Sequence, residues 1–327
     1  MKVLVTMPEH VREELFTADE WRRLESLGEV RCLADDERRL PIGVCSDVDV
    51  MVTGWESPKL ESVDGDRLRL IVHSAGGFKT VICEQVFDAG VTVSQAGSDP
   101  MAHAVAEFAL GLGICLLREI YTYDRAMRAT RDFDASQCPR LSRGITAARQ
   151  GLVGLSRTGK WHARLLRGVG CSDVVAYDPY CSESEASGLG VTLGSLDEVM
   201  GCELVSLHAP VTPETLRMIG ARELALIPDG GALVNTARAA IVDMDALERE
   251  LRSGRIRAAI DVFDEEPLDP SSPLFGLPNA LLTPHVAGGT VQARWAMGRA
   301  VVDEIERFAL GSPLQFLVQP ATVNRLS

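Results

Sequence analysis

Three side chains suited to proton and anion chemistry each follow a predicted strand: Arg238, Glu266 and His285. Histidine can donate or accept a proton near neutral pH, as the reduction of a carbonyl or the oxidation of a hydroxyl requires. A carboxylate beside it would fix its tautomer and favour its protonated form. An arginine would bind a carboxylate through two hydrogen bonds and polarise a neighbouring carbonyl. The trio therefore predicts one hydride-transfer site.

Each of the three also has an ordinary structural explanation. His285 could be a capped loop residue, Glu266 ends the acidic run Asp264-Glu265-Glu266, and Arg238 could be a solvated surface cation. Their common position favours the catalytic interpretation, because one edge of a parallel sheet gathers residues that follow its strands. Positioning them requires a sheet built from these strands and a nucleotide loop beside it.

A glycine-rich loop, GLVGLSRTG at 151–159, turns a predicted strand into a helix expected over 160–169. The dinucleotide fingerprint is G-x-G-x-x-G, and Gly154 and Gly159 take its first and third glycines. Ser156 takes the second position, where it adds bulk but also a hydroxyl. Asp178 follows Gly154 by 24 residues at a strand end. A carboxylate there accepts the ribose hydroxyls of NAD and repels the extra phosphate of NADP, so NAD is the expected cofactor.

A second loop, Ser74-Ala75-Gly76-Gly77, follows the predicted strand 68–73. Glycines at the carboxyl end of such a strand let backbone N–H groups approach an anion. Ser74, Gly76 and Gly77, together with Arg238, are therefore candidate substrate-binding residues. A tight strand-to-helix turn explains the same glycines.

Strands alternate with helices along most of the chain, which predicts α/β structure with parallel sheets. In the first hundred residues one helix is expected over 8–27. The apolar helix 99–118 has hydrophobic residues on nearly all sides and should be buried within the chain or against a second subunit. Residues 119–149 are polar, and they read as a surface arm that embraces a partner or as a solvated linker. A final helix is expected over 291–310. The strands are expected at 3–6, 30–33, 48–53, 68–73, 91–94, 151–155, 174–177, 204–208, 232–235, 258–262 and 280–283.

The composition is that of a globular protein: of 327 residues, 46% are hydrophobic and 24% charged, and the net charge is −13. This acidic balance argues against nucleic-acid partners and against an anionic membrane surface. The apolar stretch 108–117 is expected to be too short to span a bilayer. No secretory signal is recognised, so the eight scattered cysteines, Cys138 among them, are expected to be reduced thiols in the cytoplasm, with no disulfide and no metal site.

Four segments together resemble the NAD-dependent D-2-hydroxyacid dehydrogenase family: VSLHAPVTPET at 205–215, VNTAR at 234–238, DVFDEEPL at 261–268 and TPHVAGG at 283–289. The resemblance runs over nearly the whole chain. It implies two doubly wound parallel-sheet domains, with a Rossmann-type cofactor domain at 99–289 inserted into a flavodoxin-like substrate domain at 1–98 plus 290–327. It further implies a cleft that closes on ligand and a homodimer through the 99–118 helix and the 119–149 arm.

The resemblance also implies roles for individual residues. Arg238 would bind the carboxylate and carbonyl of a 2-oxo or 2-hydroxy acid, Glu266 would partner the histidine, and His285 would be the acid/base, with D stereochemistry. Asp261 would contact the nicotinamide carboxamide. The other expected cofactor contacts are Gly154, Ser156, Arg157, Thr158, Gly159, Asp178, His208, Pro210, Thr236, Ala237 and Gly288.

Three departures from the family pattern concern the substrate more than the reaction. Ser156 replaces the middle glycine, the loop at 74–79 lacks the usual aspartate, and Gln95-Ala96-Gly97-Ser98 replaces the usual Asn-x-Pro-Gly. The short tail disfavours the longer phosphoglycerate dehydrogenases, and a glutamate at 266 disfavours formate dehydrogenase. Two alternatives stay open: a dehydrogenase of another oxyanion such as phosphite, and a catalytically silent NAD(H) sensor.

Overall fold

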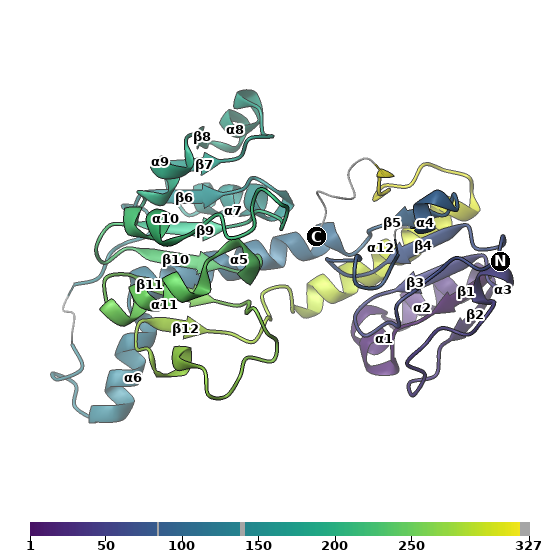
Figure 1. Ribbon diagram of the computed structural model, residues 1–327, viewed down its shortest axis with the longest axis horizontal. Helices are drawn as coiled ribbons and strands as arrows, with labels where there is room; N and C mark the ends of the chain where they lie inside the picture. Colours follow the sequence, from purple (N-terminus) through teal and green to yellow (C-terminus); the bar gives the residue numbers. More distant parts are fainter. Residues whose placement is uncertain (84, 138–140, 321–327) are drawn as a thin grey trace. The chain divides into compact units, whose positions relative to one another are not determined.

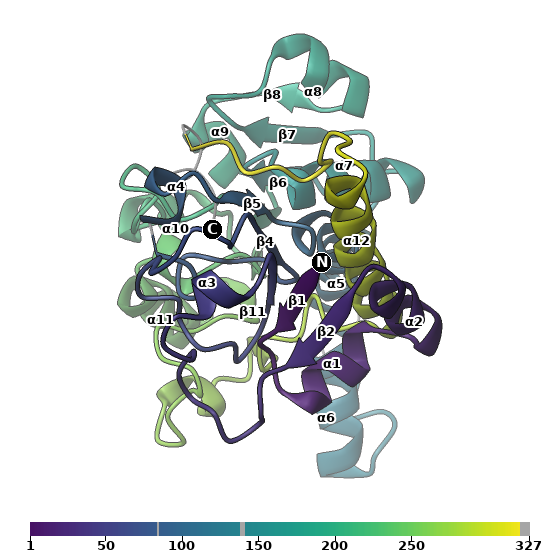
Figure 2. The ribbon, with the colours of Figure 1, turned by 90° about the vertical axis from the view of Figure 1, so that its right-hand side faces the viewer.

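The computed structural model describes residues 1–83, 85–137 and 141–320, and it divides into two compact units (Figures 1 and 2). Unit 1 comprises residues 1–101 and 289–327, and unit 2 comprises residues 102–288. The corresponding predicted division is 1–98 plus 290–327 and 99–289. Residues 321–327, which end the predicted substrate domain, lie outside the described residues. Cys138, in the predicted cofactor domain, lies outside them too. Each unit is built on one parallel sheet, which confirms the predicted α/β class.

Unit 1 contains a five-stranded sheet in the order β2-β1-β3-β4-β5, with parallel pairing throughout. This is the flavodoxin-like order expected for the substrate domain. β3 and β4 are buried at every residue, because helices cover both faces of the sheet. The strands are β1 (Lys2–Val5), β2 (Glu29–Cys32), β3 (Val50–Thr53), β4 (Leu70–His73) and β5 (Thr92–Ser94).

The helices of unit 1 correct one prediction. The single helix expected over 8–27 is two helices, because Thr17 leaves the helical conformation and its hydroxyl accepts a hydrogen bond from Glu20 N at 3.2 Å. That bond caps a new helix. The helices are α1 (Glu9–Leu15), α2 (Ala18–Ser26), α3 (Val44–Asp47), α4 (Gln85–Asp88) and the C-terminal α12 (Val291–Ala309).

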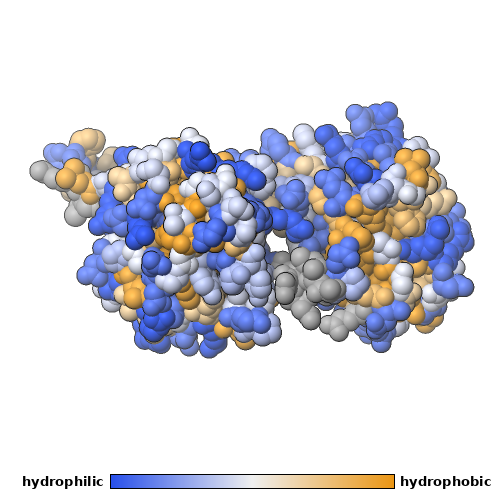
Figure 3. All heavy atoms as spheres, turned by 90° about the horizontal axis from the view of Figure 1, so that it is seen from above, coloured by the Kyte–Doolittle hydropathy of each residue, from blue (hydrophilic) through white to orange (hydrophobic). Residues whose placement is uncertain are grey.

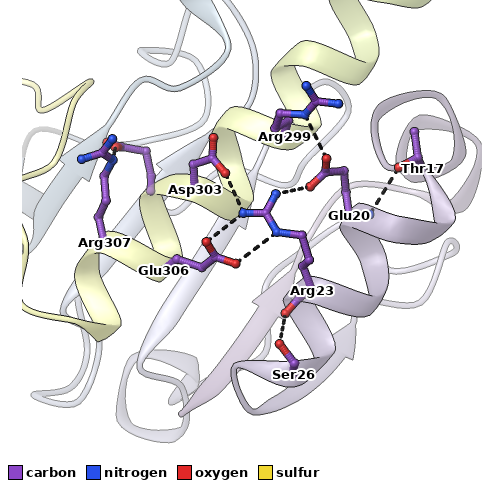
Figure 4. A network of polar contacts seen from close by, with 9 residues as sticks. Thr17, Glu20, Arg23, Ser26, Arg299, Asp303, Glu306 and Arg307 are labelled. Atoms are coloured by element: carbon purple, nitrogen blue, oxygen red, sulfur yellow. Dashed lines mark hydrogen bonds and ion pairs between the residues drawn. The ribbon is translucent and has the colours of Figure 1, made fainter.

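Charged side chains fasten α12 to α2, nearly the whole chain length away in sequence (Figure 4). Arg23 donates to Asp303 at 2.7 Å, to Glu306 at 2.8 Å and to Glu20 of its own helix at 2.6 Å. Glu20 is buried and also accepts from Arg299 at 3.0 Å. A network of this kind holds its members more firmly than isolated surface pairs do.

A buried glutamate fastens the other side of α12. Glu304 has no exposed surface, and its carboxylate accepts from Ser94 Oγ at 2.6 Å, Gln315 N at 2.8 Å and Phe316 N at 3.1 Å. Three donors compensate the desolvation of this carboxylate. The C-terminal helix is therefore an integral part of unit 1.

Unit 2 contains a seven-stranded parallel sheet in the order β12-β11-β10-β9-β6-β7-β8. The strand order reverses between β6 and β9, and ligands of doubly wound sheets bind at the carboxyl ends beside such a reversal. The strand β8 was not predicted, because two residues are too few to show an alternation of apolar and polar side chains. The strands are β6 (Gln150–Val153), β7 (Val174–Tyr177), β8 (Thr192–Leu193), β9 (Leu204–Leu207), β10 (Ala232–Asn235), β11 (Arg257–Ile260) and β12 (Ala280–Leu282).

The helices that cover this sheet are α7 (Arg157–Gly168), α8 (Glu183–Leu189), α9 (Leu196–Met200), α10 (Ala221–Leu226) and α11 (Met244–Ser253), with short 3-10 turns at Ala239–Ile241 and Pro273–Gly276. The apolar helix α5 (Ser98–Leu117) packs its leucines and alanines against β9, β10 and β11. By length and composition alone α5 could span a membrane, with 44% of it buried inside the structure. The length argument from 108–117 was therefore wrong, since the helix has 20 residues; its packing is that of a core helix.

The 119–149 arm is more regular than expected, because it begins with an 11-residue helix, α6 (Ile120–Thr130), which extends beyond β12 in Figure 1. Ile120, Tyr123 and Met127 recur at helical spacing, which the prediction of an irregular arm overlooked. Glu119 anchors its start: this buried carboxylate pairs with Arg257 on β11 and accepts from Thr122 Oγ1 at 2.9 Å. No residue of α6 is buried in the described part of the chain. Residues 138–140 of the arm lie outside that part.

Candidate active site

The glycine-rich loop connects β6 to α7, and it leaves no space for a side chain at Gly154 or Gly159. A Cβ on Gly154, whose φ is +93°, would lie 2.7 Å from Ala209 N. A Cβ on Gly159 would lie 2.2 Å from Gly154 O. Both positions therefore require glycine, as the fingerprint predicts. Ser156 is the N-cap of α7, which is why the helix begins at Arg157 and not at the predicted Lys160.

Asp178 performs a structural task that the sequence did not reveal. Its Oδ2 accepts from Leu155 N at 2.6 Å and its Oδ1 from Tyr180 N at 2.8 Å. The carboxylate at the end of β7 thus holds the glycine loop at the end of the adjacent β6. Each oxygen keeps a second lone pair, so the same carboxylate can still accept from ribose hydroxyls.

These residues fit the dinucleotide that the fingerprint implies. The first N–H groups of α7, from Arg157, Thr158 and Gly159, begin a 12-residue helix whose amino end favours a phosphate. Thr236 is buried, and its hydroxyl has no hydrogen-bond partner among the described residues. A buried polar atom without a partner is rare, and a ligand atom is one way to satisfy it.

The remaining predicted cofactor contacts differ in accessibility. Pro210, Ala237 and Gly288 are partly exposed at the carboxyl edge of the sheet. His208 is buried, and its side chain turns into the core, where it meets His162. Any contact of His208 with a cofactor would therefore involve its main chain. The structure tests none of these contacts directly, and they stay predictions.

Arg238, Glu266 and His285 follow β10, β11 and β12, which are neighbours in the sheet. Asn235 shapes the turn that carries Arg238: its Nδ2 donates to Arg238 O at 3.0 Å and its Oδ1 accepts from Ala237 N at 3.1 Å. Burial lowers the pKa of Arg238, and the nearby Glu266 opposes that effect. The guanidinium stays charged at neutral pH, and its partial removal from water strengthens its attraction for an anion.

His285 and Glu266 form the expected pair, with His285 Nδ1 2.6 Å from Glu266 Oε2. An ionised carboxylate only accepts hydrogen bonds, so Nδ1 carries the hydrogen and Nε2 is the nitrogen that exchanges a proton. The other oxygen of Glu266 accepts from Phe263 N at 3.0 Å, which fixes the carboxylate. The His285 side chain is 47% exposed and therefore reachable.

The charge state of Glu266 supports this arrangement. Burial raises its pKa most, but the hydrogen bonds from His285 and Phe263 and the charges of His285 and Arg238 outweigh burial, so the pKa of Glu266 lies below its usual value. A carboxyl with a lowered pKa stays ionised through neutral and mildly acidic pH, and its stabilising effect is lost only as the pH falls through that lowered value.

The backbone of His285 is strained, with φ at +54°, a region that residues other than glycine seldom occupy. Asp261 holds this conformation. Its buried carboxylate accepts from Thr283 Oγ1 at 2.5 Å, from Val286 N at 3.0 Å and from Ala287 N at 3.0 Å, on both sides of His285. The contact between Asp261 and the nicotinamide carboxamide stays a prediction. The observed role of Asp261 is to position the histidine loop.

The candidate substrate loop lies in unit 1, after β4. Ser74 is fully buried, and its hydroxyl has no partner within the described chain. Gln95, also buried, donates to Gly76 O and so fixes the loop. Gly77 is partly exposed, and a Cβ on Gly76 would lie 2.5 Å from Met101 Cε, so a side chain there would require the flexible Met101 side chain to move.

Three buried histidines predict how stability depends on pH. Burial lowers the pKa of His73 and of His162 to about 4, and burial together with the neighbouring His162 lowers the pKa of His208 well below its usual value. Between pH 6.5 and 4 the unfolded chain therefore binds protons that the folded chain does not, so the free energy of unfolding falls with falling pH. From pH 7 to 5 we expect a loss of about 2 kcal/mol for each of His73 and His162. Urea unfolding at both values measures it, and equal stabilities would contradict the neutral state of these residues.

Within residues 1–83, 85–137 and 141–320, no group of three or more His, Cys, Asp or Glu side chains could hold a metal ion. The cysteines described there, Cys32, Cys45, Cys83, Cys115, Cys171, Cys181 and Cys202, are free thiols.

Comparison with known proteins agrees with this geometry. Residues 110–287 match the model of the D-isomer specific 2-hydroxyacid dehydrogenase NAD binding domain. D-3-phosphoglycerate dehydrogenase of Methanocaldococcus jannaschii is 30% identical over 95% of this chain, although the chain covers only 58% of that protein. The chain spans about half the length of the D-3-phosphoglycerate dehydrogenases it matches.

A shorter relative matches over most of both chains. Glyoxylate reductase of Korarchaeum cryptofilum is 30% identical, over 79% of this chain and 77% of its own. A solved protein structure from Thermus thermophilus has a TM-score of 0.79 and 27% identity, and the match covers 98% of this chain and 100% of that one.

Proposed function

Because the chain belongs to the D-isomer specific 2-hydroxyacid dehydrogenase family and its cofactor is NAD, we propose that it interconverts a small 2-oxo acid and the D-2-hydroxy acid, with His285 as the acid/base. The His285–Glu266 hydrogen bond beside Arg238 is the observation that carries this proposal. A protein that only senses nucleotides has no need to hold a strained histidine against an ionised carboxylate.

The His285–Glu266 hydrogen bond and the nearby charge of Arg238 support the following roles. Arg238 binds the substrate carboxylate and polarises the carbonyl with its remaining N–H groups. His285 Nε2 gives a proton to the carbonyl oxygen during reduction and takes it back during oxidation. Glu266 stabilises the protonated imidazole and keeps Nδ1 as the donor. The bound nicotinamide supplies or accepts the hydride. Ser74, Gly76 and Gly77 of unit 1 remain predicted substrate contacts.

Assaying purified chain with NADH and a panel of 2-oxo acids tests the proposal. We expect NADH binding, seen by fluorescence, and oxidation with at least one acid. Oxidation of phosphite with NAD would instead support a dehydrogenase of another oxyanion. Tight NADH binding without turnover on any of these compounds would favour the silent sensor and overturn the proposal.

Asp178 should set the preference for NADH over NADPH. Asp178→Asn removes the charge but keeps an acceptor for Leu155 N, so it is a cleaner variant than Asp178→Ala. We expect the ratio of kcat/KM values for NADH and NADPH to fall at least about tenfold, because a carboxylate repels the extra phosphate. Glu183→Gln, at an exposed residue of α8, is the charge-matched control. A wild-type preference for NADPH would contradict the role of Asp178.

A homodimer through α5 and the 119–149 arm is part of the proposal. The arm exposes large apolar side chains, among them Ile120 (49%), Met127 (43%), Phe133 (70%) and Leu141 (89%). Figure 3 shows that other hydrophobic residues are also exposed, interspersed with polar ones. Light scattering should give twice the 35.4 kDa chain mass, and Met127→Asp should reduce it to one chain. A wild-type monomer would remove the dimer from the proposal.

The cytoplasmic location and the lack of nucleic-acid or membrane partners remain predictions.

A further inference from the structure

The glycine loop touches the segment that follows β9, at the reversal of strand order. A Cβ on Gly159 would lie 3.4 Å from His208 Cβ, and one on Gly154 would lie 2.7 Å from Ala209 N. His208 N also donates to Val153 O at 2.8 Å. The amino end of α7 and the segment from His208 to Pro210 therefore pack directly together. Both are segments where cofactor contacts are expected.

Ser156 bonds these two segments through the hydroxyl that distinguishes it from the usual glycine. Its Oγ donates to His208 O at 2.7 Å. The same oxygen caps α7 through a longer contact with Gly159 N, at 3.5 Å. A glycine at 156 would leave the His208 carbonyl without this donor. The unusual residue in the fingerprint thus has a definite bonding role.

The side chain of His208 makes a second connection to the same helix. Its Nε2 lies 2.7 Å from Nδ1 of His162, six residues after Ser156 along α7, and the rings meet edge to face at 87°. His162 and His208 are both buried. Residue 208 is therefore fastened to α7 twice, through its carbonyl by Ser156 and through its imidazole by His162.

Burying the His162–His208 pair costs more free energy than burying two apolar side chains in the same place would. Burial lowers the pKa of both histidines, so at neutral pH they share one N–H···N hydrogen bond. The outer nitrogens, His162 Nε2 and His208 Nδ1, have no partner in the described part of the chain. Each unsatisfied buried group costs about 1–3 kcal/mol. Two apolar side chains would avoid that cost, which indicates that the directional bond itself has a use.

We propose that Ser156, His162 and His208 form a brace that holds the Ala209–Pro210 segment at a fixed distance from the amino end of α7, and that this brace sets the affinity for NAD(H). All three are positioning residues for the cofactor. The brace follows β6 and β9, whereas Arg238, Glu266 and His285 follow β10, β11 and β12. Loss of the brace should therefore weaken cofactor binding and leave the chemical step largely intact. The inference rests on NAD binding but does not depend on which 2-oxo acid is the substrate.

The test compares His162→Leu and Ser156→Ala with wild type. In each variant a group of His208 loses its partner, so we expect the Kd for NADH, measured by fluorescence, to rise about tenfold. In His162→Leu the kcat at saturating NADH should stay within about twofold, because His162 is buried behind the glycine loop and Arg238, Glu266 and His285 are unchanged. The double variant should raise the Kd by less than the product of the single effects, because both bonds hold one residue. Ser156→Thr keeps a hydroxyl and should restore most of the affinity.

Leu166→Ala is the matched control, because Leu166 is fully buried on the same helix in the cluster behind β6 and β7. It should lower Tm with little change in the Kd for NADH. The brace is overturned if His162→Leu and Ser156→Ala lower Tm but leave the Kd unchanged, or if Leu166→Ala raises the Kd equally. Should His162→Leu fail to fold, His162→Gln takes its place, because Ser156→Ala alone could also remove a direct contact between Ser156 and the cofactor. Absence of NADH binding by wild type would instead count against the cofactor itself.

Discussion

Replacing His285 with alanine should lower kcat for 2-oxo acid reduction by about 10³-fold or more and leave the Kd for NADH nearly unchanged. General acid–base groups contribute roughly 10²–10⁴-fold. His285 should lie at the upper end, because Glu266 fixes its tautomer and the loop around Asp261 fixes its direction. Stopped-flow oxidation of NADH together with fluorescence titration separates the two quantities.

Glu266→Gln is the companion variant. It keeps a hydrogen-bonding group beside Nδ1 but removes the charge that stabilises the protonated imidazole, so kcat should fall less than in His285→Ala. Equal losses of kcat and of NADH affinity in His285→Ala would contradict its role as the acid/base.

Replacing Arg238 with lysine should lower kcat/KM for the 2-oxo acid by about 10²–10³-fold, with both kcat and KM affected. A lysine keeps the charge but cannot form two parallel bonds to a carboxylate, and it would not reach the carbonyl in the same geometry. The loss corresponds to about 3–4 kcal/mol of transition-state binding. Steady-state kinetics at saturating NADH measure it directly.

The control is Arg252→Lys, because Arg252 is exposed on α11. Arg257 is unsuitable as a control, because it pairs with the buried Glu119. Arg252→Lys should leave both constants unchanged. If Arg238→Lys retained wild-type kcat/KM, the substrate carboxylate would have to bind elsewhere, and the assignment of Arg238 would be wrong.

The parallel sheets and the cofactor loop could be predicted because their signals are local. Four-residue apolar strands alternate with helices, and Gly154 and Gly159 occupy positions where any side chain would collide with backbone. The residues of the trio also lie where expected, since each follows a strand and parallel strands end at one sheet edge. The His285–Glu266 bond is the part of that prediction that the geometry itself displays.

The rest depends on contacts between residues far apart in sequence, which no local pattern records. Asp178 was expected to face ribose, but the bond to Leu155 N, which steadies the loop, needs the register of β6 and β7. Nothing in the local sequence marks His162, and only the position of His208 after β9 shows that the two side chains meet. The break at Thr17 is different: its capping hydroxyl was readable, and the helix prediction over 8–27 overlooked it.

The most direct test of the proposed reaction is to analyse the product formed with NADH and a 2-oxo acid by chiral chromatography, alongside the NADH consumed. With Arg238 binding the substrate carboxylate and His285, paired with Glu266, donating the proton, we expect one D-2-hydroxy acid for each NADH oxidised, and none with His285→Ala. An L-hydroxy acid, or NADH bound without any hydroxy acid appearing, would contradict this mechanism.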